Sequence, residues 1–593
     1  MLKTLLKCVR QYKWVSLITP LFMILEVLME ALIVKEAGSL VNIINPKDGN
    51  MLPKSELMPE VIKAGAILVG MAIISLTCGI FGGIFGAKAS AGFASNVRHD
   101  LFHKIQEFSF ENIDTFQTSS LVTRMTTDVS NVQMAYQMIL RITIRVPLQM
   151  ISAIVLAFTI DNELPWLFIF IIPFLAFAFI SLIRIVMPTF RKLFKRYDAL
   201  NNSVQENIKG IRVVKSYVRE DYEKDKFNNT SDILANDFTK AERILALNNP
   251  IMQLAIHVAI LLMSYFGAKA VCTNKSLFGG VSTLQVGDFQ VLITYGVQIL
   301  GSIMMLSMIF VMMSMSYECA VRICEVLNTK SSLDNPENPI YEVKNGDITF
   351  KDVCFKYQQG ADKFALFDID LEIKSGETIG IIGGTGSSKT TLVNLISRLY
   401  DVSSGSILVG GVDVKDYDLK TLRDNVSVVL QKNVLFSGTI ADNLRWGNKD
   451  ATMEEIEEAA NLAQASEFIN SFPNGYETYI EQGGTNVSGG QKQRLCIARA
   501  LLKKPKVLIL DDSTSAVDTQ TDAKIRSGLK DFLPDVTKLI IAQRISSVMN
   551  ADKIIVLDNG TINAFGTHDE LLKSNEIYQE VYYTQNKVGD NNA

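Results

Sequence analysis

A glycine-rich segment, Gly383-Gly384-Thr385-Gly386-Ser387-Ser388-Lys389-Thr390, separates two runs of different character. The run before it, 378–382, is short and apolar and predicts a buried strand, whereas the run after it, 391–396, has helical spacing. In such a strand–loop–helix, backbone N–H groups and the positive end of the helix dipole meet at one point and hold a phosphate. A plain glycine turn is the alternative.

Two side chains of this segment are of the types that bind a nucleoside triphosphate and its Mg²⁺ ion. We expect Lys389 to reach the β- and γ-phosphates and Thr390 to offer its hydroxyl to the Mg²⁺ ion. The position before the lysine is glycine in the consensus and Ser388 in this chain. If that position requires a positive φ, the Cβ of serine costs about 1–2 kcal/mol.

The composition of the 593-residue chain excludes several classes of protein. With 48% hydrophobic residues and a net charge of −4, the chain gives no indication of a nucleic-acid partner. Its seven cysteines include no C-x-x-C pair, so we expect neither a zinc site nor a disulfide framework, and its four histidines indicate no histidine metal site. No cleavable signal peptide is evident, and the basic amphipathic N-terminus is expected to lie on a membrane surface.

Six apolar stretches in the first half are long enough to cross a bilayer, which takes about 20 residues. Buried helices of a large soluble core are the alternative, but six stretches in succession favour membrane spans. We expect these spans at residues 15–42, 61–87, 138–160, 164–187, 248–271 and 288–313.

The charge of the connecting segments predicts the orientation of the spans. The loops after the first, third and fifth spans are short and poor in Lys and Arg, whereas segments 88–137 and 188–247 are long and strongly charged. By the positive-inside rule, we expect these two segments and both termini to lie in the cytoplasm. Helical periodicity continues through both segments, and each is expected to turn through a short transverse helix, near 112–120 and 211–221.

Two acidic residues of the first span, Glu26 and Glu30, lie four apart and therefore on one helix face. Charge inside a membrane is costly and usually faces a cavity or a partner. One interpretation is a polar patch in a translocation cavity that favours cationic or amphipathic cargo. The other is a water-exposed stretch or a pair of structural ion contacts.

The chain divides at a polar stretch rich in Asn, Asp and Pro. Residues 1–325 form the expected transmembrane domain and residues 326–344 the linker. Over residues 345–585, short β-rich runs alternate with helical ones and predict a compact α/β domain. The polar tail, 586–593, is expected to be loose. The expected fold is a six-helix, all-α transmembrane domain with long cytosolic helix extensions, followed by an α/β P-loop domain.

Two further motifs follow the glycine-rich segment. The apolar run Val507-Leu508-Ile509-Leu510-Asp511 predicts a strand ending in an acid that holds Mg²⁺ opposite Thr390, and Asn486-Val487-Ser488-Gly489-Gly490-Gln491 precedes it. In this order and spacing, the three motifs resemble those of the nucleotide-binding domain of ATP-binding cassette (ABC) transporters. With the six spans, nearly the whole chain resembles an ABC exporter half-transporter of the bacterial multidrug or lipid type.

The resemblance implies an ATP-driven exporter in which two nucleotide-binding domains enclose two ATP molecules. It assigns Tyr357 to adenine stacking, Gln431 to sensing the γ-phosphate and Mg²⁺, and residues 515–518 to a loop that crosses to the partner domain. The two transverse helices match the coupling helices of the family. The implied ATP contacts are Tyr357, Gly383, Gly384, Thr385, Gly386, Ser387, Ser388, Lys389, Thr390, Thr391 and Gln431, with Ser488, Gly489, Gly490 and Gln491 completing the partner's site; the implied Mg²⁺ ligands are Thr390, Gln431 and Asp511.

The catalytic positions depart from the family pattern. The family has glutamate after Asp511, where it activates the attacking water, and this chain has Asp512. The switch histidine of the family is replaced by Gln543. Aspartate is one methylene shorter, and a misplacement of about 1 Å can cost about 10²-fold in rate. Glutamine donates a hydrogen bond but carries no imidazolium charge. Of the implied catalytic residues Asp512, Gln543 and Gln431, only Gln431 matches the family.

A weakened nucleotide site combined with an intact Ser488 signature predicts one half of a heterodimer. The chain then holds ATP in a slow site and completes a hydrolytic site on a second half-transporter. A homodimeric exporter with slow, symmetric hydrolysis is one alternative, since aspartate can act as a base. An ATP-gated channel or sensor that does not pump is the other. The expected cargo is an amphipathic compound or a lipid.

Overall fold

The computed structural model describes residues 1–46, 53–274, 283–357, 363–513 and 516–590. These residues form two compact units. The helical unit contains Met1–Gln106 and Ser119–Thr329, and the α/β unit contains Glu107–Thr118 together with the chain from Lys330 onward. The sequence predicted a division at the linker 326–344, and it did not anticipate that twelve residues of the first half, Glu107–Thr118, pack with the second.

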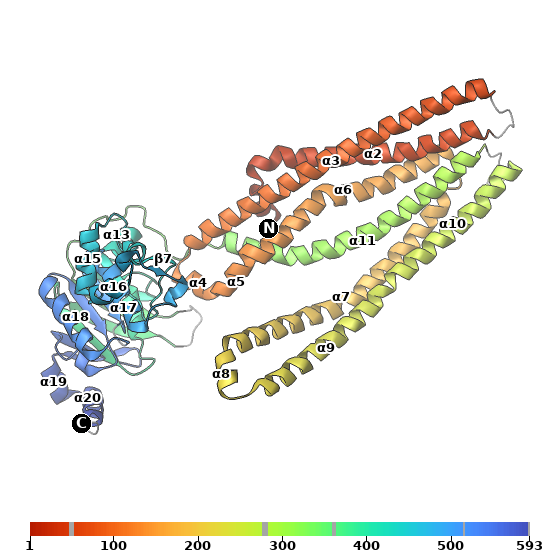
Figure 1. Cartoon of the computed structure of the whole chain (residues 1–593). Helices are drawn as coiled ribbons and strands as arrows, with labels where there is room; N and C mark the ends of the chain where they lie inside the picture. The colour runs from red at the N-terminus through yellow and green to blue at the C-terminus, as the bar shows by residue number, and fades with distance from the viewer. Residues whose placement is uncertain (47–52, 275–282, 358–362, 514–515, 591–593) are drawn as a thin grey trace. The chain divides into compact units, whose positions relative to one another are not determined.

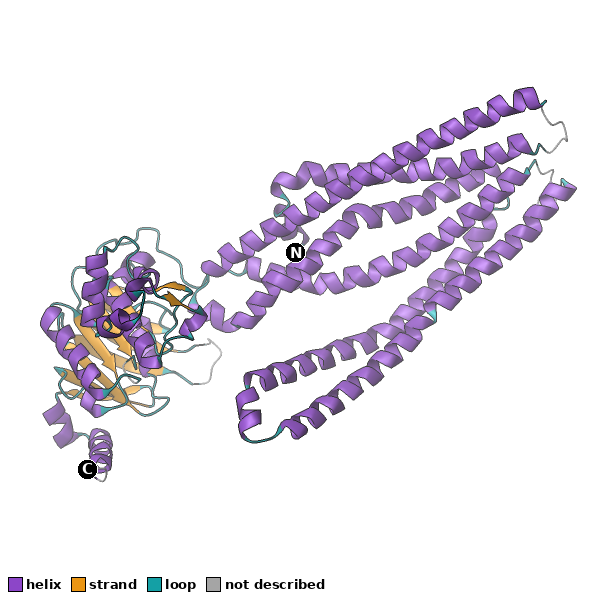
Figure 2. Cartoon of the chain, viewed as in Figure 1, coloured by secondary structure: helices purple, strands orange, loops and turns teal. Residues whose placement is uncertain are grey.

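The helical unit contains no strand among its described residues, as Figure 2 shows. In the part of the chain that the structure describes, six helical stretches are long and apolar enough to cross a membrane, which agrees with the predicted number. Prolines occur inside several of these helices, for example Pro20 and Pro147. The helices are α1 (Leu2–Lys7), α2 (Lys13–Ile44), α3 (Lys54–Gln106), α5 (Thr118–Thr123), α6 (Val129–Ile160), α7 (Trp166–Lys209), α8 (Ile211–Ser216), α9 (Glu220–Ala246), α10 (Asn248–Thr273) and α11 (Val286–Asn328).

A short helix lies near each of the two segments for which the sequence predicted a transverse helix, with different bounds. The first is α4 (Phe110–Phe116), followed at once by α5, where the sequence predicted 112–120. Its start is fixed by a capping box, in which the Ser109 hydroxyl accepts from the Asn112 N–H. The second is α8, which is shorter than the predicted 211–221 because α9 already begins at Glu220. Figure 1 shows α8 at the tip of a hairpin formed by α7 and α9.

The acidic pair of the first span lies in an ion cluster between α2 and α6. The Arg145 guanidinium donates to Glu26 Oε1 at 3.0 Å and to Glu30 Oε1 at 2.7 Å. Helix α3 approaches Glu26 closely at Gly79, where a Cβ would lie 3.2 Å from Glu26 Oε1. Opposite charges are the arrangement expected for buried ionic groups in a membrane. The geometry matches the structural ion contacts that the sequence left open as one alternative.

The α/β unit is built on two main sheets. The four-stranded sheet has the order β2-β1-β4-β5, and the six-stranded sheet has the order β12-β11-β3-β10-β9-β6. Strands β11, β3, β10, β9 and β6 run parallel. The strands are β1 (Ile348–Phe355), β2 (Leu366–Ile373), β3 (Thr378–Gly383), β4 (Ser404–Val409), β5 (Val412–Asp413), β6 (Val426–Val429), β7 (Gly438–Thr439), β8 (Tyr479–Ile480), β9 (Val507–Asp511), β10 (Thr537–Ile541), β11 (Lys553–Asp558) and β12 (Thr561–Gly566).

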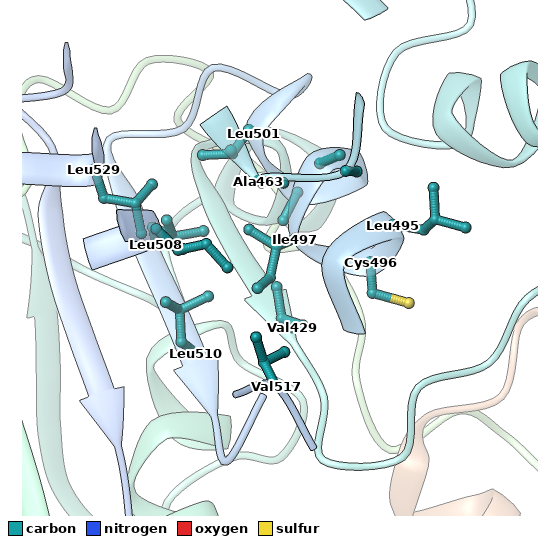
Figure 3. Close-up of a cluster of buried hydrophobic side chains, with 14 of the residues drawn as sticks. Val429, Ala463, Leu495, Cys496, Ile497, Leu501, Leu508, Leu510, Val517 and Leu529 are labelled. Atoms are coloured by element: carbon teal, nitrogen blue, oxygen red, sulfur yellow. The ribbon is translucent and has the colours of Figure 1, made fainter. Parts of the chain in front are cut away.

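Helices cover the parallel sheet and supply the core. Figure 3 shows Ile497 and Leu501 of α17 in one cluster with Leu508 and Leu510 of β9. A second cluster contains Leu392 of α12. These contacts bury the strands on both faces, as parallel strands require. The remaining helices are α12 (Lys389–Ile396), α13 (Leu419–Asn425), α14 (Ile440–Arg445), α15 (Met453–Leu462), α16 (Ser466–Ser471), α17 (Gly489–Leu501), α18 (Thr519–Phe532), α19 (His568–Ser574) and α20 (Glu576–Asp590).

Two predicted boundaries differ from the observed ones. Helix α11 continues to Asn328, so the first three residues of the predicted linker, 326–344, are helical. Helix α20 continues to Asp590, although the sequence predicted a loose tail from residue 586. Val326 and Leu327 continue the apolar pattern of α11 beyond the predicted boundary. The end of α20 is mostly polar, and such residues carry no apolar periodicity to mark where a helix stops.

Candidate nucleotide-binding site

Strand register brings the predicted site residues to one edge of the parallel sheet. Ile541 of β10 lies opposite Ile381 of β3 on one side and opposite Asp511 of β9 on the other. Carboxyl ends of parallel strands meet at the same edge, and ligands bind there in open α/β sheets. The glycine-rich loop, Asp511, Asp512 and Gln543 therefore meet, although they are far apart in the sequence.

The glycine-rich loop has the geometry that the sequence predicted. It follows β3 and ends where α12 begins at Lys389. Ser388 has φ +71° and ψ 25°, which is the left-handed conformation that favours glycine. Gly386 also has a positive φ, +83°. The condition under which Ser388 carries strain is thus met.

Ser388→Gly should raise the free energy of unfolding of the α/β unit by about 1 kcal/mol, because glycine adopts a positive φ without Cβ strain. The greater freedom of glycine in the unfolded chain offsets part of the gain. Ser388→Ala is the control: it keeps the Cβ, and no capping bond is lost because the Ser388 side chain makes none.

Urea unfolding of the full chain measures this effect. The chain has three tryptophans, of which Trp446 lies in the α/β unit. The substitutions Trp14→Phe and Trp166→Phe remove the other two, so that tryptophan fluorescence reports on the α/β unit alone. An unchanged or lower midpoint for the glycine variant would contradict strain at Ser388.

Lys389 folds back over the loop. Its Nζ donates to the carbonyl oxygens of Gly383 and Gly384, both at 2.8 Å, and to Ser387 Oγ at 3.3 Å. Burial lowers the pKa of Lys389, while the charges of Asp511 and Asp512 act in the opposite direction. Phosphate oxygens would replace the carbonyl oxygens as partners of this ammonium group, and a charged partner makes the stronger bond.

Two of the three predicted Mg²⁺ ligands, Thr390 and Asp511, contact each other. Thr390 Oγ1 donates to Asp511 Oδ2 at 2.9 Å, and Asp511 is 2% exposed. Burial raises the pKa of the Asp511 carboxyl, and the Thr390 hydrogen bond partly counteracts it. A hydroxyl and a carboxylate are hard oxygen ligands, which Mg²⁺ prefers. Together they fit a Mg²⁺ ion that would stabilise the ionised form of Asp511.

Asp512 and Gln543, which the resemblance implies to be catalytic, contact each other. Gln543 Nε2 donates to Asp512 Oδ2 at 2.8 Å. The loop that carries Gln543 is held by Gln585 of α20, whose Nε2 donates to the Gln543 carbonyl at 2.9 Å and whose Oε1 accepts from the Ile545 N–H at 2.8 Å. Sequence reasoning did not identify Gln585, and no motif marks it. The site therefore contains a hydrogen-bonded glutamine–aspartate pair at the two positions where the resemblance implies a histidine and a glutamate.

The remaining predicted ATP contacts on this side lie near the same loop. Tyr357 is 42% exposed, and its Oη shares a hydrogen bond with Thr391 Oγ1 at 2.8 Å. Tyr400, which the sequence analysis missed, contacts Tyr357 with its ring edge. Gln431 follows β6 and is exposed. Because β6 pairs in parallel with β9, Gln431 lies at the edge of the sheet that carries Asp511.

The Ser488 signature opens α17. The Ser488 hydroxyl accepts from the Gln491 N–H at 3.3 Å, and Gln491 Oε1 accepts from the Ser488 N–H at 2.9 Å. This capping box leaves Gly489 and Gly490 in the first turn, where N–H groups attract negative charge. Of the predicted crossing loop, Ser515 lies outside the described residues, and Asp518 caps α18 by accepting from the Thr521 N–H.

Comparisons with known proteins identify the family of the chain. The family model described as ABC transporter transmembrane region matches residues 15–303, and the model described as ABC transporter matches residues 366–515. An uncharacterized ABC transporter ATP-binding protein of Mycobacterium tuberculosis is 36% identical over 530 residues, covering 88% of this chain and 89% of its own. An ATP-dependent lipid A-core flippase of Photobacterium profundum is 32% identical over 523 residues, covering 87% of each chain.

One solved structure shares the architecture of the whole chain. A bacterial Atm1-family ABC exporter with ATP bound matches with a TM-score of 0.81 over 97% of this chain and 99% of that chain. Its sequence identity of 22% supports the fold alone. The membrane spans and the ATP-binding α/β unit thus occur in one polypeptide, with the spans first, as in ABC exporters. The relatives match both parts of the chain. The chain therefore belongs to the ABC transporter family and has the fold of an ABC exporter.

Proposed function

We propose that this protein is the ATP-binding subunit of a heterodimeric exporter and that its own nucleotide site hydrolyses ATP slowly. The observation that supports this proposal is the 2.8 Å hydrogen bond from Gln543 Nε2 to Asp512 Oδ2. That bond occupies a lone pair of the carboxylate that would orient the attacking water. Asp512 is also one methylene shorter than glutamate, and Gln543 supplies no titratable ring.

In this proposal, the Ser488 signature of the chain completes the hydrolytic site of the partner. The capping box holds the Ser488 hydroxyl and the N–H groups of Gly489 and Gly490 at the start of α17, where they can face a γ-phosphate. The partner is a second half-transporter with glutamate after its Walker B aspartate and histidine at its switch. Mg²⁺ bound through Thr390, Asp511 and Gln431 would neutralise phosphate charge in the slow site.

The cargo we propose is an amphipathic compound or a lipid, moved out of the cytoplasm or the inner leaflet of a bacterial plasma membrane, with both termini of the chain in the cytoplasm. Similarity to a lipid A-core flippase over 87% of the chain supports this class of cargo. The strongly charged segments 88–137 and 188–247 support the orientation.

Purification of the chain alone, in lipid nanodiscs, tests the heterodimer. We expect the isolated chain to bind Mg²⁺–ATP but to turn over about 10²-fold more slowly than the assembled pair, the factor that a 1 Å misplacement can cost. Turnover at several per second without a partner would support the symmetric homodimer instead. Tight binding with no nucleotide-dependent transport by the assembled pair would support the non-pumping channel or sensor.

Glu30→Gln tests the cavity interpretation of the first span. If Glu30 faces the cargo, transport of a cationic dye should fall about fivefold relative to a neutral dye, since about 1 kcal/mol of charge interaction corresponds to that factor. Glu36→Gln, on the same helix outside the ion cluster, is the control. Equal transport of both dyes by Glu30→Gln and by Glu26→Gln would leave the cluster with a purely structural role beside Arg145.

A further inference from the structure

A cluster of aromatic rings lies beside the nucleotide site and extends to α4. Tyr400 is at its centre: its ring centroid is 5.3 Å from that of Tyr357, with an interplanar angle of 87°. Tyr400 also packs against Phe355 at 5.7 Å and against Phe110 of α4 at 6.0 Å. Edge-to-face packing is orientation-dependent, so a rotation of one ring disturbs the next.

Hydrogen bonds fix both ends of this cluster. At one end, Tyr357 Oη shares a hydrogen bond with Thr391 Oγ1 in the first turn of α12, beside the phosphate-binding loop. At the other end, Tyr400 Oη donates to Asp114 Oδ2 of α4 at 2.7 Å. Burial and this carboxylate both raise the pKa of Tyr400, so its hydroxyl stays protonated and remains the donor.

Helix α4 is tied to the α/β unit by further bonds to the segment after α11. Ser109 Oγ shares a hydrogen bond with Ser332 Oγ at 2.7 Å, and Asn112 Nδ2 donates to the Lys330 carbonyl at 3.4 Å. In the chain, α4 lies between α3 and α5, and α3 contains a predicted membrane span. A change at Asp114 therefore acts on a segment that is covalently continuous with a spanning helix.

We propose that Tyr400 is a positioning residue that links the base-binding Tyr357 to α4 through Asp114, so that α4 responds to the adenine as well as to the phosphates. This inference rests on the proposed role of Tyr357 as the adenine contact. A base stacked on Tyr357 constrains the ring of Tyr357, and the perpendicular contact passes that constraint to Tyr400. The Tyr400 hydroxyl then holds Asp114, and with it α4, in one position.

Hydrogen exchange of the α4 amides, residues 110–116, in the full chain in nanodiscs tests this proposal. Mg²⁺–ATP supplies phosphates and base, whereas Mg²⁺–tripolyphosphate supplies phosphates alone. In the native chain we expect ATP to slow α4 exchange several-fold more than saturating tripolyphosphate does. In Tyr400→Phe the two ligands should differ by less than twofold, while the ATP affinity changes by less than threefold.

Matched variants separate this role from a general effect of removing a hydroxyl. Tyr417→Phe deletes a buried hydroxyl that donates to the Val409 carbonyl in the same unit, outside the cluster, and should preserve the ATP-specific slowing. Asp114→Asn keeps an acceptor oxygen and should preserve most of it, whereas Asp114→Ala should abolish it. The double variant Tyr400→Phe/Asp114→Ala should lose no more than either single variant, since both act through one bond.

The outcomes distinguish this inference from the proposed nucleotide site. Undiminished ATP-specific slowing in Tyr400→Phe, or no difference between ATP and tripolyphosphate in the native chain, would overturn the link while leaving ATP binding intact. If Tyr357→Ala left the ATP affinity unchanged, the adenine contact itself would be wrong, and the link would fall with it.

Discussion

Combined Asp512→Glu and Gln543→His substitutions should raise ATP hydrolysis at this chain's own site by about 10²-fold, because they return the carboxylate by about 1 Å to the position of a catalytic base. The double variant also removes the amide that donates to Asp512 Oδ2 in the native chain. Histidine in its place can carry positive charge next to the γ-phosphate. We expect Asp512→Glu alone to raise the hydrolysis rate by less than the double variant does, since Gln543 would still bind the carboxylate.

The measurement is single-site hydrolysis in the assembled pair, with the catalytic glutamate of the partner changed to glutamine so that only this chain's site reports. Asp558→Glu is the matched control, because it makes the same change at the end of β11, a parallel strand of the same sheet that pairs with β3 and not with β9. If the double variant and the native chain hydrolysed ATP at the same rate and retained nucleotide equally, Asp512 and Gln543 would not be what limits the hydrolysis rate of this site.

Ser488→Ala should lower hydrolysis at the partner's site by about 10²-fold or more, the usual cost of removing one donor that faces developing negative charge. The same substitution should affect this chain's own site much less, because in the proposed heterodimer the signature contacts the ATP of the opposite site. It also deletes an N-cap, at a cost of about 1 kcal/mol in stability.

Thr452→Ala separates these two effects. Thr452 caps α15 through the same kind of capping box, with its hydroxyl accepting from the Glu455 N–H at 3.3 Å, and it lies outside the nucleotide motifs. Both variants should lose similar stability, and only Ser488→Ala should lose turnover. Equal loss of turnover in the two variants would mean that Ser488 acts only as a helix cap.

Several features of this protein could be predicted from the pattern of neighbouring residues in the sequence. Hydropathy alone located six spans, because a bilayer demands about 20 apolar residues whatever the packing. The glycine-rich segment, with its strand before and helix after, was readable because contiguous residues form it. The sequence predicted strain at Ser388 only on the condition of a positive φ, and the structure shows that φ is positive there, +71°.

Contacts between segments that are distant in the chain could not be predicted from the sequence pattern. The sequence identified Asp512 and Gln543 as separate departures, but only the register of β9 and β10 brings them within hydrogen-bond distance. It identified Glu26 and Glu30 without Arg145, which lies on another helix. It missed Tyr400, whose partner Asp114 is 286 residues away.

The sequence by itself therefore determined the two kinds of domain, the chemistry of each motif and the likeness to ABC exporters, all of which depend on neighbouring residues along the chain. The tertiary structure decided which substituted side chains bind each other, which charges neutralise the acidic pair, and that α4 packs with the α/β unit. The physical reason is that hydrogen bonds and ion pairs act over about 3 Å, and distances of that order between remote residues are fixed by strand register and helix packing.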